Sequence, residues 1–204
     1  MDESSTVFIV DDDAAVRDSL GFLMESVGLK CETFASSQDF LSAYTPHQLG
    51  CLVSDIRMPG MSGLDLQREL QARHDPIPMI FITGHGDVPM AVEAMRQGAM
   101  GFLQKPFRDQ ELLDQVHVAL AHDRSEHDRI MARRGFEERL STLTAREKDV
   151  MELVVQGLPN KSIATNLNVS HRTVEIHRAR VMEKMGARSV AELVRMDLSL
   201  GSAA

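Results

Sequence analysis

A short apolar run that ends at a single carboxylate is the feature that most constrains the fold of this chain. Residues 51–53 read Cys-Leu-Val, Asp55 follows two positions later, and the segment then breaks at Pro59 and Gly60. An apolar run that is bounded by turn residues predicts a buried parallel strand. Because open α/β sheets bind their ligands at the carboxyl ends of such strands, we expect Asp55 to lie at a ligand-binding edge.

Four further apolar runs predict strands, and most are followed by a segment with the apolar spacing of a helix. The strands are expected over residues 7–10, 30–34, 78–83 and 100–103. The five expected helices include the apolar residues Val16, Leu41, Leu66, Val92 and Leu112. Strands that alternate with helices in this way predict an α/β domain, with a doubly wound parallel sheet and helices on both of its faces.

Polar side chains stand just after four of the expected strands. They are Asp11 with Asp12, then Asp55, Thr83 and Lys105. The carboxyl ends of parallel strands meet at one edge of a sheet, so we expect these groups to converge although they are far apart in the sequence. On their own, the acidic residues at positions 11–13 fit a solvated helix start equally well, since carboxylates favour the amino end of a helix.

Crowded carboxylates predict a raised pKa or a bound cation. Oxygen ligands suit Mg²⁺, or Mn²⁺ in its place, and we expect Asp12 and Asp55 to bind the ion directly and Asp11 to bind it through water. The backbone carbonyl of Arg57, just past Asp55, completes the expected ligand set. A carboxylate can attack phosphorus, so we interpret Asp55 as the acceptor of a phosphoryl group.

Lys105 and Thr83 are the expected partners of the transferred phosphoryl group. The ammonium of Lys105 would offset the charge on the phosphoryl oxygens, and the hydroxyl of Thr83 would donate to one of them. The main alternative is a phosphohydrolase with an Asp nucleophile. Such enzymes usually carry a second carboxylate two residues after the nucleophile, where this chain has Arg57. We therefore expect a phosphoacceptor, with self-dephosphorylation at most, and no separate enzymatic activity.

The last third of the chain predicts four helices. Thr144 and Glu147 form a capping-box pattern, Asn160 is placed to cap a short second helix, and Ser189 to cap the fourth. The third helix is longer and carries basic residues, and with the second it predicts a helix-turn-helix over about residues 160–179. An ordinary small helical domain with a solvated basic face is the alternative that this spacing leaves open.

Charge separates the chain into an acidic part and a mildly basic part. Residues 1–124 hold 9 Lys and Arg against 19 Asp and Glu, a net charge of −10, whereas residues 141–204 hold 9 against 7, a net charge of +2. This asymmetry predicts two domains with different partners. We expect domains at residues 1–121 and 141–204, joined by a charged, mostly helical linker over residues 122–140.

Composition excludes several other classes of protein. No apolar run approaches the roughly 20 residues that a membrane helix needs, and the first residues lack the pattern of a signal peptide. We therefore expect a cytoplasmic protein that does not engage a membrane. The two cysteines, Cys31 and Cys51, are too few for a disulfide framework or a zinc site and are expected to be reduced and largely buried.

Residues 7–121 resemble the receiver domain of two-component response regulators, the FixJ group in particular. The motifs that carry the resemblance are Val10-Asp11-Asp12-Asp13, Ser54-Asp55-Ile56-Arg57-Met58-Pro59, Ile82-Thr83-Gly84-His85-Gly86-Asp87 and Leu103-Gln104-Lys105-Pro106-Phe107. The resemblance implies a flavodoxin-like fold with strand order 2-1-3-4-5, a cis bond before Pro106, and phosphorylation of Asp55 by a sensor histidine kinase. It also implies a switch formed by Thr83 and Phe102, although Phe102 fits a core aromatic as well.

Residues 143–194 resemble the LuxR-type DNA-binding domain of the FixJ/NarL regulators. The motifs are Leu143-Thr144-Ala145-Arg146-Glu147, Gly157-Leu158-Pro159-Asn160-Lys161-Ser162-Ile163-Ala164 and Ser170-His171-Arg172-Thr173-Val174-Glu175-Ile176-His177. The resemblance implies that the helix from Arg172 enters the major groove of a double-stranded operator. Glu175, Ile176 and Ala179 then face bases, the candidates for phosphate contacts are Lys161, Thr173, Arg178 and Lys184, and His177 is as much a structural candidate as a DNA-binding one.

Together the two resemblances imply a transcription factor that phosphorylation activates. The expected partners are a histidine kinase, operator DNA, RNA polymerase and, after phosphorylation, a second copy of the chain. A DNA-binding regulator whose receiver is vestigial and needs no phosphate is a further alternative, which the complete acidic set disfavours.

Overall fold

The computed structural model describes residues 5–75, 77–84 and 88–198 of the 204-residue chain. The chain divides into two compact units, residues 1–127 and residues 128–204, and each is described here by itself. This division falls inside the expected linker. The helix α5 (Asp109–Ser141) includes the residues on both sides of this boundary.

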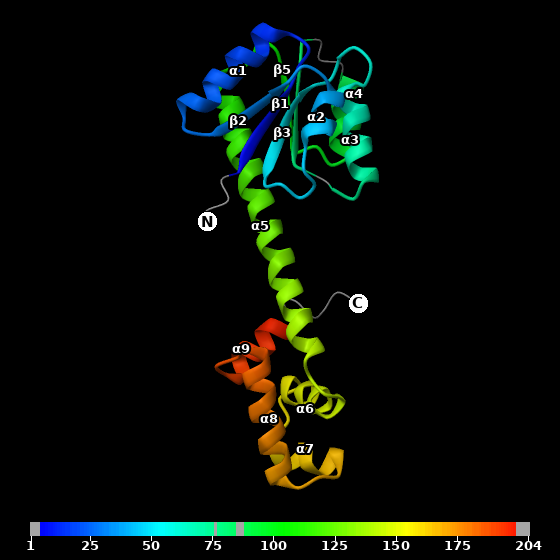
Figure 1. Cartoon of the computed structure of the whole chain (residues 1–204), viewed down its shortest axis with the longest axis vertical. Coiled ribbons are helices and arrows are strands. Elements are labelled where there is room, and N and C mark those ends of the chain that lie inside the picture. Colours follow the sequence, from blue (N-terminus) through cyan, green and yellow to red (C-terminus); the bar gives the residue numbers. More distant parts are fainter. Residues whose placement is uncertain (1–4, 76, 85–87, 199–204) are drawn as a thin grey trace. The chain divides into compact units, whose positions relative to one another are not determined.

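The first unit is built on a sheet of five parallel strands in the order β2-β1-β3-β4-β5 (Figure 1). The expected fold class and strand order are thereby confirmed. The strands are β1 (Thr6–Val10), β2 (Lys30–Phe34), β3 (Gly50–Asp55), β4 (Met79–Thr83) and β5 (Gly101–Gln104). The central strands β1, β3 and β4 are almost fully buried, as continuous apolar runs predict for parallel strands that are covered on both faces.

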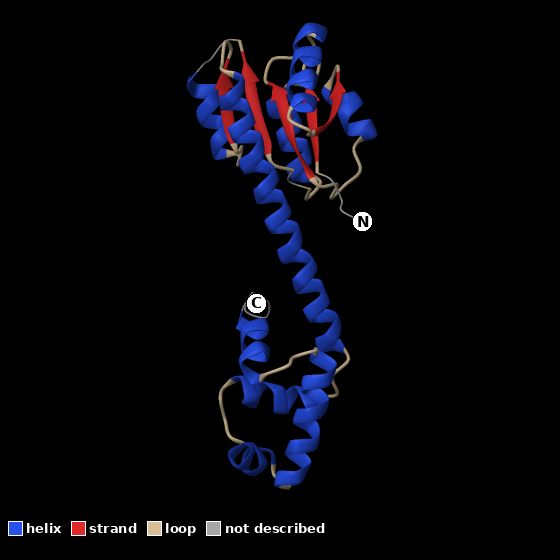
Figure 2. Cartoon of the chain, turned by 90° about the vertical axis from the view of Figure 1, so that its left-hand side faces the viewer, coloured by secondary structure: helices blue, strands red, loops and turns tan. Residues whose placement is uncertain are grey.

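Five helices cover this sheet: α1 (Ala14–Ser26), α2 (Ser37–Ala43), α3 (Gly63–Ala72), α4 (Val88–Arg96) and the first part of α5. Figures 1 and 2 show α1 and α5 on one face and α2, α3 and α4 on the other. Alternation along β1 serves both faces, since Val7 and Ile9 join the core under α1 and α5 whereas Phe8 and Val10 join the core under the other three helices.

Gly63 brings the start of α3 against the end of β3. A Cβ atom at this position would clash with the backbone carbonyl of Asp55. The backbone N–H of Gly63 also donates to the carbonyl of Ile56 at 3.0 Å. Glycine is therefore required here for the close packing of the backbone beside the candidate acceptor.

The second unit is all-helical, as expected. After the end of α5 it contains α6 (Ala145–Val155), α7 (Asn160–Leu167), α8 (His171–Met185) and α9 (Val190–Met196). Thr144 and Glu147 form the predicted capping box of α6, and Ser189 caps α9. The helices pack on one core that includes Val150, Ile163, Val174, Val181 and Leu193.

One predicted helix start differs in detail, and it concerns α7. Asn160 is the first residue of α7; Pro159 occupies the cap position, without a side-chain capping bond. The peptide bond between Lys105 and Pro106 is cis, as the resemblance to receiver domains implies. Among the described residues, no helix has both the length and the apolar character needed to cross a membrane.

Candidate functional site

Three carboxylates converge at the carboxyl edge of the sheet. Asp11 and Asp12 follow β1, Asp55 ends β3, and one oxygen from each lies within 4.8 Å of the others. Asp11 is buried, Asp55 is partly buried and Asp12 is exposed. All three donors are carboxylate oxygens, the ligand type that Mg²⁺ prefers, and the exposed Asp12 leaves the cluster open to water and phosphate.

The most buried of these carboxylates is held from two sides. Asp11 is 1% exposed, its Oδ2 accepts a hydrogen bond of 2.8 Å from Nζ of Lys105, and its Oδ1 accepts one of 2.9 Å from the backbone N–H of Asp13. Arg17 donates from Nη1 to the backbone carbonyl of Asp11 at 2.7 Å. Sequence reasoning missed Arg17, because nothing in a single arginine on α1 indicates that it folds back over the preceding loop.

Asp55 lies in an environment that disfavours its charged form. Burial is the largest cause and raises the pKa of its carboxyl, Lys105 opposes this increase, and Asp11 adds to it. The backbone N–H of Arg57 donates weakly to Asp55 Oδ1 at 3.4 Å. Repulsion between Asp11 and Asp55 is what a divalent cation would relieve, so the residues fit the expected metal.

Thr83 and Lys105 reach the same edge from β4 and the end of β5. Thr83 is 1% exposed and its backbone carbonyl accepts the N–H of Lys105 at 2.8 Å. Phe102 stands opposite Phe81 in the ladder between β4 and β5 and packs, partly buried, against the core under α3 and α4. It therefore contributes to the core, as one of the two expectations for Phe102 states. The motif residues 85–87, including His85, lie outside the described residues.

A second set of candidate residues lies along α8. Val174 and Val181 are 0% and 1% exposed and face the core. Arg172, Glu175, Ile176 and Ala179 are exposed on the same helix, and Lys161 is exposed on α7. Thr173 and His177 are partly buried, and the Nδ1 atom of His177 is buried without a hydrogen-bond partner in the described structure.

Two candidate phosphate contacts already have partners within the unit. Lys184 donates from Nζ to Glu147 Oε2 at 2.6 Å and to the carbonyl of Thr142 at 3.0 Å. The hydrogen bond from Lys184 lowers the pKa of Glu147 to about 2, with the backbone N–H of Thr144 as the next cause. Arg178 donates from Nη1 to Oδ1 of Asn160 at 2.7 Å. Lys184 thus serves an internal ion pair, whatever further contact it makes.

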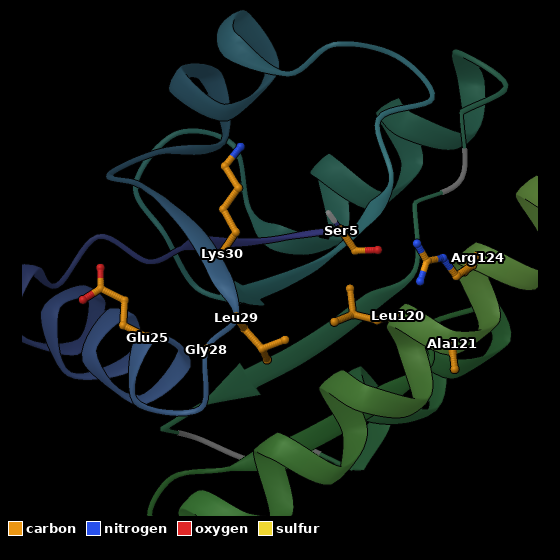
Figure 3. Close-up of a pocket in the computed structure, with 8 residues that line it drawn as sticks. All are labelled: Ser5, Glu25, Gly28, Leu29, Lys30, Leu120, Ala121 and Arg124. Atoms are coloured by element: carbon orange, nitrogen blue, oxygen red, sulfur yellow. The ribbon is translucent and has the colours of Figure 1, made fainter. Parts of the chain in front are cut away.

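A separate cavity of about 820 Å³ opens on the first unit, between the end of α1, the start of β2 and α5 (Figure 3). Eight residues line it: Ser5, Glu25, Gly28, Leu29, Lys30, Leu120, Ala121 and Arg124. Ser5 directly precedes β1 and Lys30 is the first residue of β2, so this cavity lies at the amino edge of the sheet, opposite the edge that holds Asp55. The ammonium of Lys30 pairs with Glu32 at 3.1 Å, and the polar groups of the lining do not converge on one point in Figure 3.

Family models match both units of the chain. The model described as "Response regulator receiver domain" matches residues 7–117, and the model described as "Bacterial regulatory proteins, luxR family" matches residues 141–197. These matches enclose the acidic site and the candidate residues of α7 and α8.

Relatives match over nearly the whole chain. The chain is 49% identical to the transcriptional regulatory protein FixJ of Azorhizobium caulinodans, over 100% of the chain and 96% of that protein. It is 48% identical to nodulation protein W of Bradyrhizobium diazoefficiens, over 99% and 90%. Among solved structures, the response regulator StyR has a TM-score of 0.86 at 46% identity, covering 95% of this chain and 98% of that one. The chain therefore belongs to the two-component response regulators of the FixJ group, transcriptional regulators that join a receiver to a LuxR-type DNA-binding domain.

Proposed function

We propose that Asp55 accepts a phosphoryl group from a sensor histidine kinase in the presence of Mg²⁺ or Mn²⁺, and that this modification promotes dimerisation and operator binding. The observation that carries the proposal is the convergence of Asp11, Asp12 and Asp55 within 4.8 Å at the carboxyl edge of the sheet. Lys105, paired with Asp11, brings a cation to the same place. A divalent ion bound by these oxygens would supply the charge needed to draw phosphoryl oxygens toward a carboxylate.

Asp55, Lys105 and Thr83 would each have a separate role in the phosphoryl transfer. An oxygen of Asp55 attacks phosphorus and forms a P–O bond, while the bond from phosphorus to the donor breaks and the donor leaves with the electron pair. Lys105 is placed to stabilise charge on the transferred oxygens, and the hydroxyl of Thr83 to donate to one of them. Asp55 is partly buried, so the acyl phosphate formed on it would be shielded from some of the surrounding water.

Thr83, Lys105 and Phe102 would couple phosphorylation of Asp55 to a change on the surface of the first unit. A phosphoryl group adds roughly −1.5 to −2 charges at Asp55. We propose that this charge draws Thr83 and Lys105 inward and that Phe102 turns into the space they leave. The surface of α4, β5 and α5 then changes shape and pairs with a second copy. The protein would act in the cytoplasm, at promoters, together with RNA polymerase.

Labelling of the full-length protein tests the acceptor. With acetyl phosphate and Mg²⁺ we expect the mass of the wild-type chain to rise by one phosphoryl group, and we expect Asp55→Asn to abolish this gain. Asp39→Asn, on the exposed first turn of α2, is the matched control and should be labelled like the wild type. Undiminished labelling of Asp55→Asn would contradict the assignment, and continuous release of phosphate over many turnovers would favour a phosphohydrolase instead.

A further inference from the structure

The side chain of Asn160 does not have the role that its sequence position predicts. The pattern predicts a helix cap, yet α7 begins at Asn160 itself and Pro159 occupies the cap position. The side-chain oxygen of Asn160 instead accepts a hydrogen bond of 2.7 Å from the guanidinium of Arg178, eighteen residues further along the chain. This bond joins the first helix of the helix-turn-helix to the second.

Arg178 occupies the border between the buried and the exposed sides of α8. Val174 and Val181, four residues before it and three after it, are buried, whereas Glu175 and Ala179 are exposed. Arg178 itself is partly buried. A guanidinium group has five N–H donors in a planar fork, and the bond to Asn160 uses one of them. The others remain able to meet an anion at this border.

The kind of partner distinguishes Arg178 from two other cations of the second unit, Lys184 and Arg146, which are paired with carboxylates. Lys184 is paired with the carboxylate of Glu147 at 2.6 Å, and Arg146 with that of Asp149 at 3.3 Å. In the described part of the chain, no carboxylate forms a salt bridge with Arg178, and the acceptor that holds it is a neutral amide. An amide fixes the position of the guanidinium without cancelling its charge.

We infer that Asn160 is a positioning residue for DNA binding, which holds the guanidinium of Arg178 ready for a backbone phosphate of the duplex. The inference rests on the proposed function of this unit as a DNA-binding domain. Fixing a long side chain before binding reduces the conformational entropy that would otherwise be lost in the complex. The planar fork of arginine also suits the geometry of a phosphate group.

A double-mutant cycle on the full-length protein tests the inference. Binding to a double-stranded DNA of mixed sequence is measured over a range of salt concentrations, with beryllofluoride and Mg²⁺ present. We expect Asn160→Ala to weaken binding about three- to tenfold, the effect of freeing one long side chain, with the salt dependence unchanged because Arg178 keeps its charge. Arg178→Ala should lower the salt slope by about 1. In the Arg178→Ala background, Asn160→Ala should cause no further loss.

Two further variants control for folding. Asn166→Ala changes an exposed asparagine on the same helix and should bind DNA like the wild type. Asn160→Asp places a carboxylate in the first turn of α7, where the helix dipole favours it, and should pair with Arg178 and lower the salt slope by about 1 without loss of thermal stability. Wild-type protein that bound no DNA would contradict the proposed function. DNA binding by the wild type together with an unaffected Asn160→Ala variant, or a loss that persists without Arg178, would overturn the inference.

Discussion

The acidic site of the first unit and the exposed face of α8 hold their charged groups in opposite ways. Asp11 is 1% exposed and has both a cationic and a backbone partner within the chain, whereas Arg172 and Glu175 are exposed to solvent. The contacts of Asp11 stabilise the folded state of the first unit. The exposed charges of α8 can form their strongest interactions only when a partner binds. Substitutions at the acidic site should therefore change stability as well as chemistry, whereas substitutions of exposed residues of α8, such as Arg172 and Glu175, should change binding alone.

The largest expected effect comes from breaking the ion pair between Lys105 and Asp11. Lys105→Met leaves a buried carboxylate without its cation, so we expect the first unit to lose about 3 kcal/mol of unfolding free energy, measured by denaturant titration without divalent ions. Added Mg²⁺ should recover part of this loss, since the ion would restore the missing positive charge.

Lys30→Met is the matched control for that experiment. The pair of Lys30 with Glu32 is exposed, with side-chain exposures of 52% and 42%, and such pairs contribute less than about 1 kcal/mol. Equal losses in the two variants would break the contrast between the internal charges and the exposed ones.

The second prediction is that a phosphoryl mimic at the acidic site changes the oligomeric state and DNA affinity of the whole protein. Beryllofluoride with Mg²⁺ mimics the phosphoryl group, and we expect it to convert the full-length protein from a monomer to a dimer in sedimentation. Operator affinity should rise in step, because a dimer can hold two helix-turn-helix units about 34–36 Å apart, or a multiple of that, on two half-sites. Asp55→Asn should remain monomeric. A wild-type monomer that nonetheless gains affinity would favour the release of a masked DNA-binding face.

The acidic site could be anticipated because its parts are marked by local signals. Each of Asp11, Asp55, Thr83 and Lys105 follows an apolar run, and the parallel register then brings them to one edge. That register depends on topology rather than on any side chain of the site. The starts of α6 and α9 also followed from local signals, the capping box of Thr144 with Glu147 and the cap Ser189.

The contacts that were not predicted involve side chains that could bond either a residue nearby in the sequence or one far from it. Asn160 has the right position for a cap and bonds Arg178 instead, and Lys184 reads as a surface cation yet bonds the buried Glu147. Propensity alone cannot resolve such choices, since they depend on how α7 and α8 pack. The role of each residue in DNA binding stays a prediction, because exposure on α8 alone does not identify a contact.

The third prediction concerns Glu147, a carboxylate of the second unit that is buried and paired with a cation, as Asp11 is in the acidic site. The pKa of Glu147 falls from its ordinary value of 4.5 to about 2. A lowered pKa means that the folded state favours the ionised form, so this stabilisation is present above pH 4.5 and is lost as the pH falls toward 2. Glu147→Gln should flatten the dependence of stability on pH over that range.

Glu152→Gln, an exposed change on the same helix, is the control and should leave the pH dependence unchanged. Stability is measured by thermal unfolding of the full-length protein, following the transition of the second unit at each pH. A wild-type transition that is flat between pH 4.5 and pH 2 would show that Glu147 and Lys184 do not stabilise the fold as an ion pair.

The smallest expected effect is at Glu175, and it tests the exposed side of the comparison. A carboxylate has no electrostatic reason to face DNA unless it accepts a hydrogen bond, for example from N4 of cytosine. We expect Glu175→Ala to relax preference at one operator position by about 1 kcal/mol, measured by competition among single-base variants, without reducing the salt slope. The Nδ1 atom of His171 lies 3.5 Å from Oε1 of Glu175. His171→Ala removes this contact within the helix and keeps Glu175, so it separates a role of Glu175 in base recognition from a role in the structure of α8. If both variants weakened binding to all sequences equally, Glu175 would act through the structure of α8 rather than through a base.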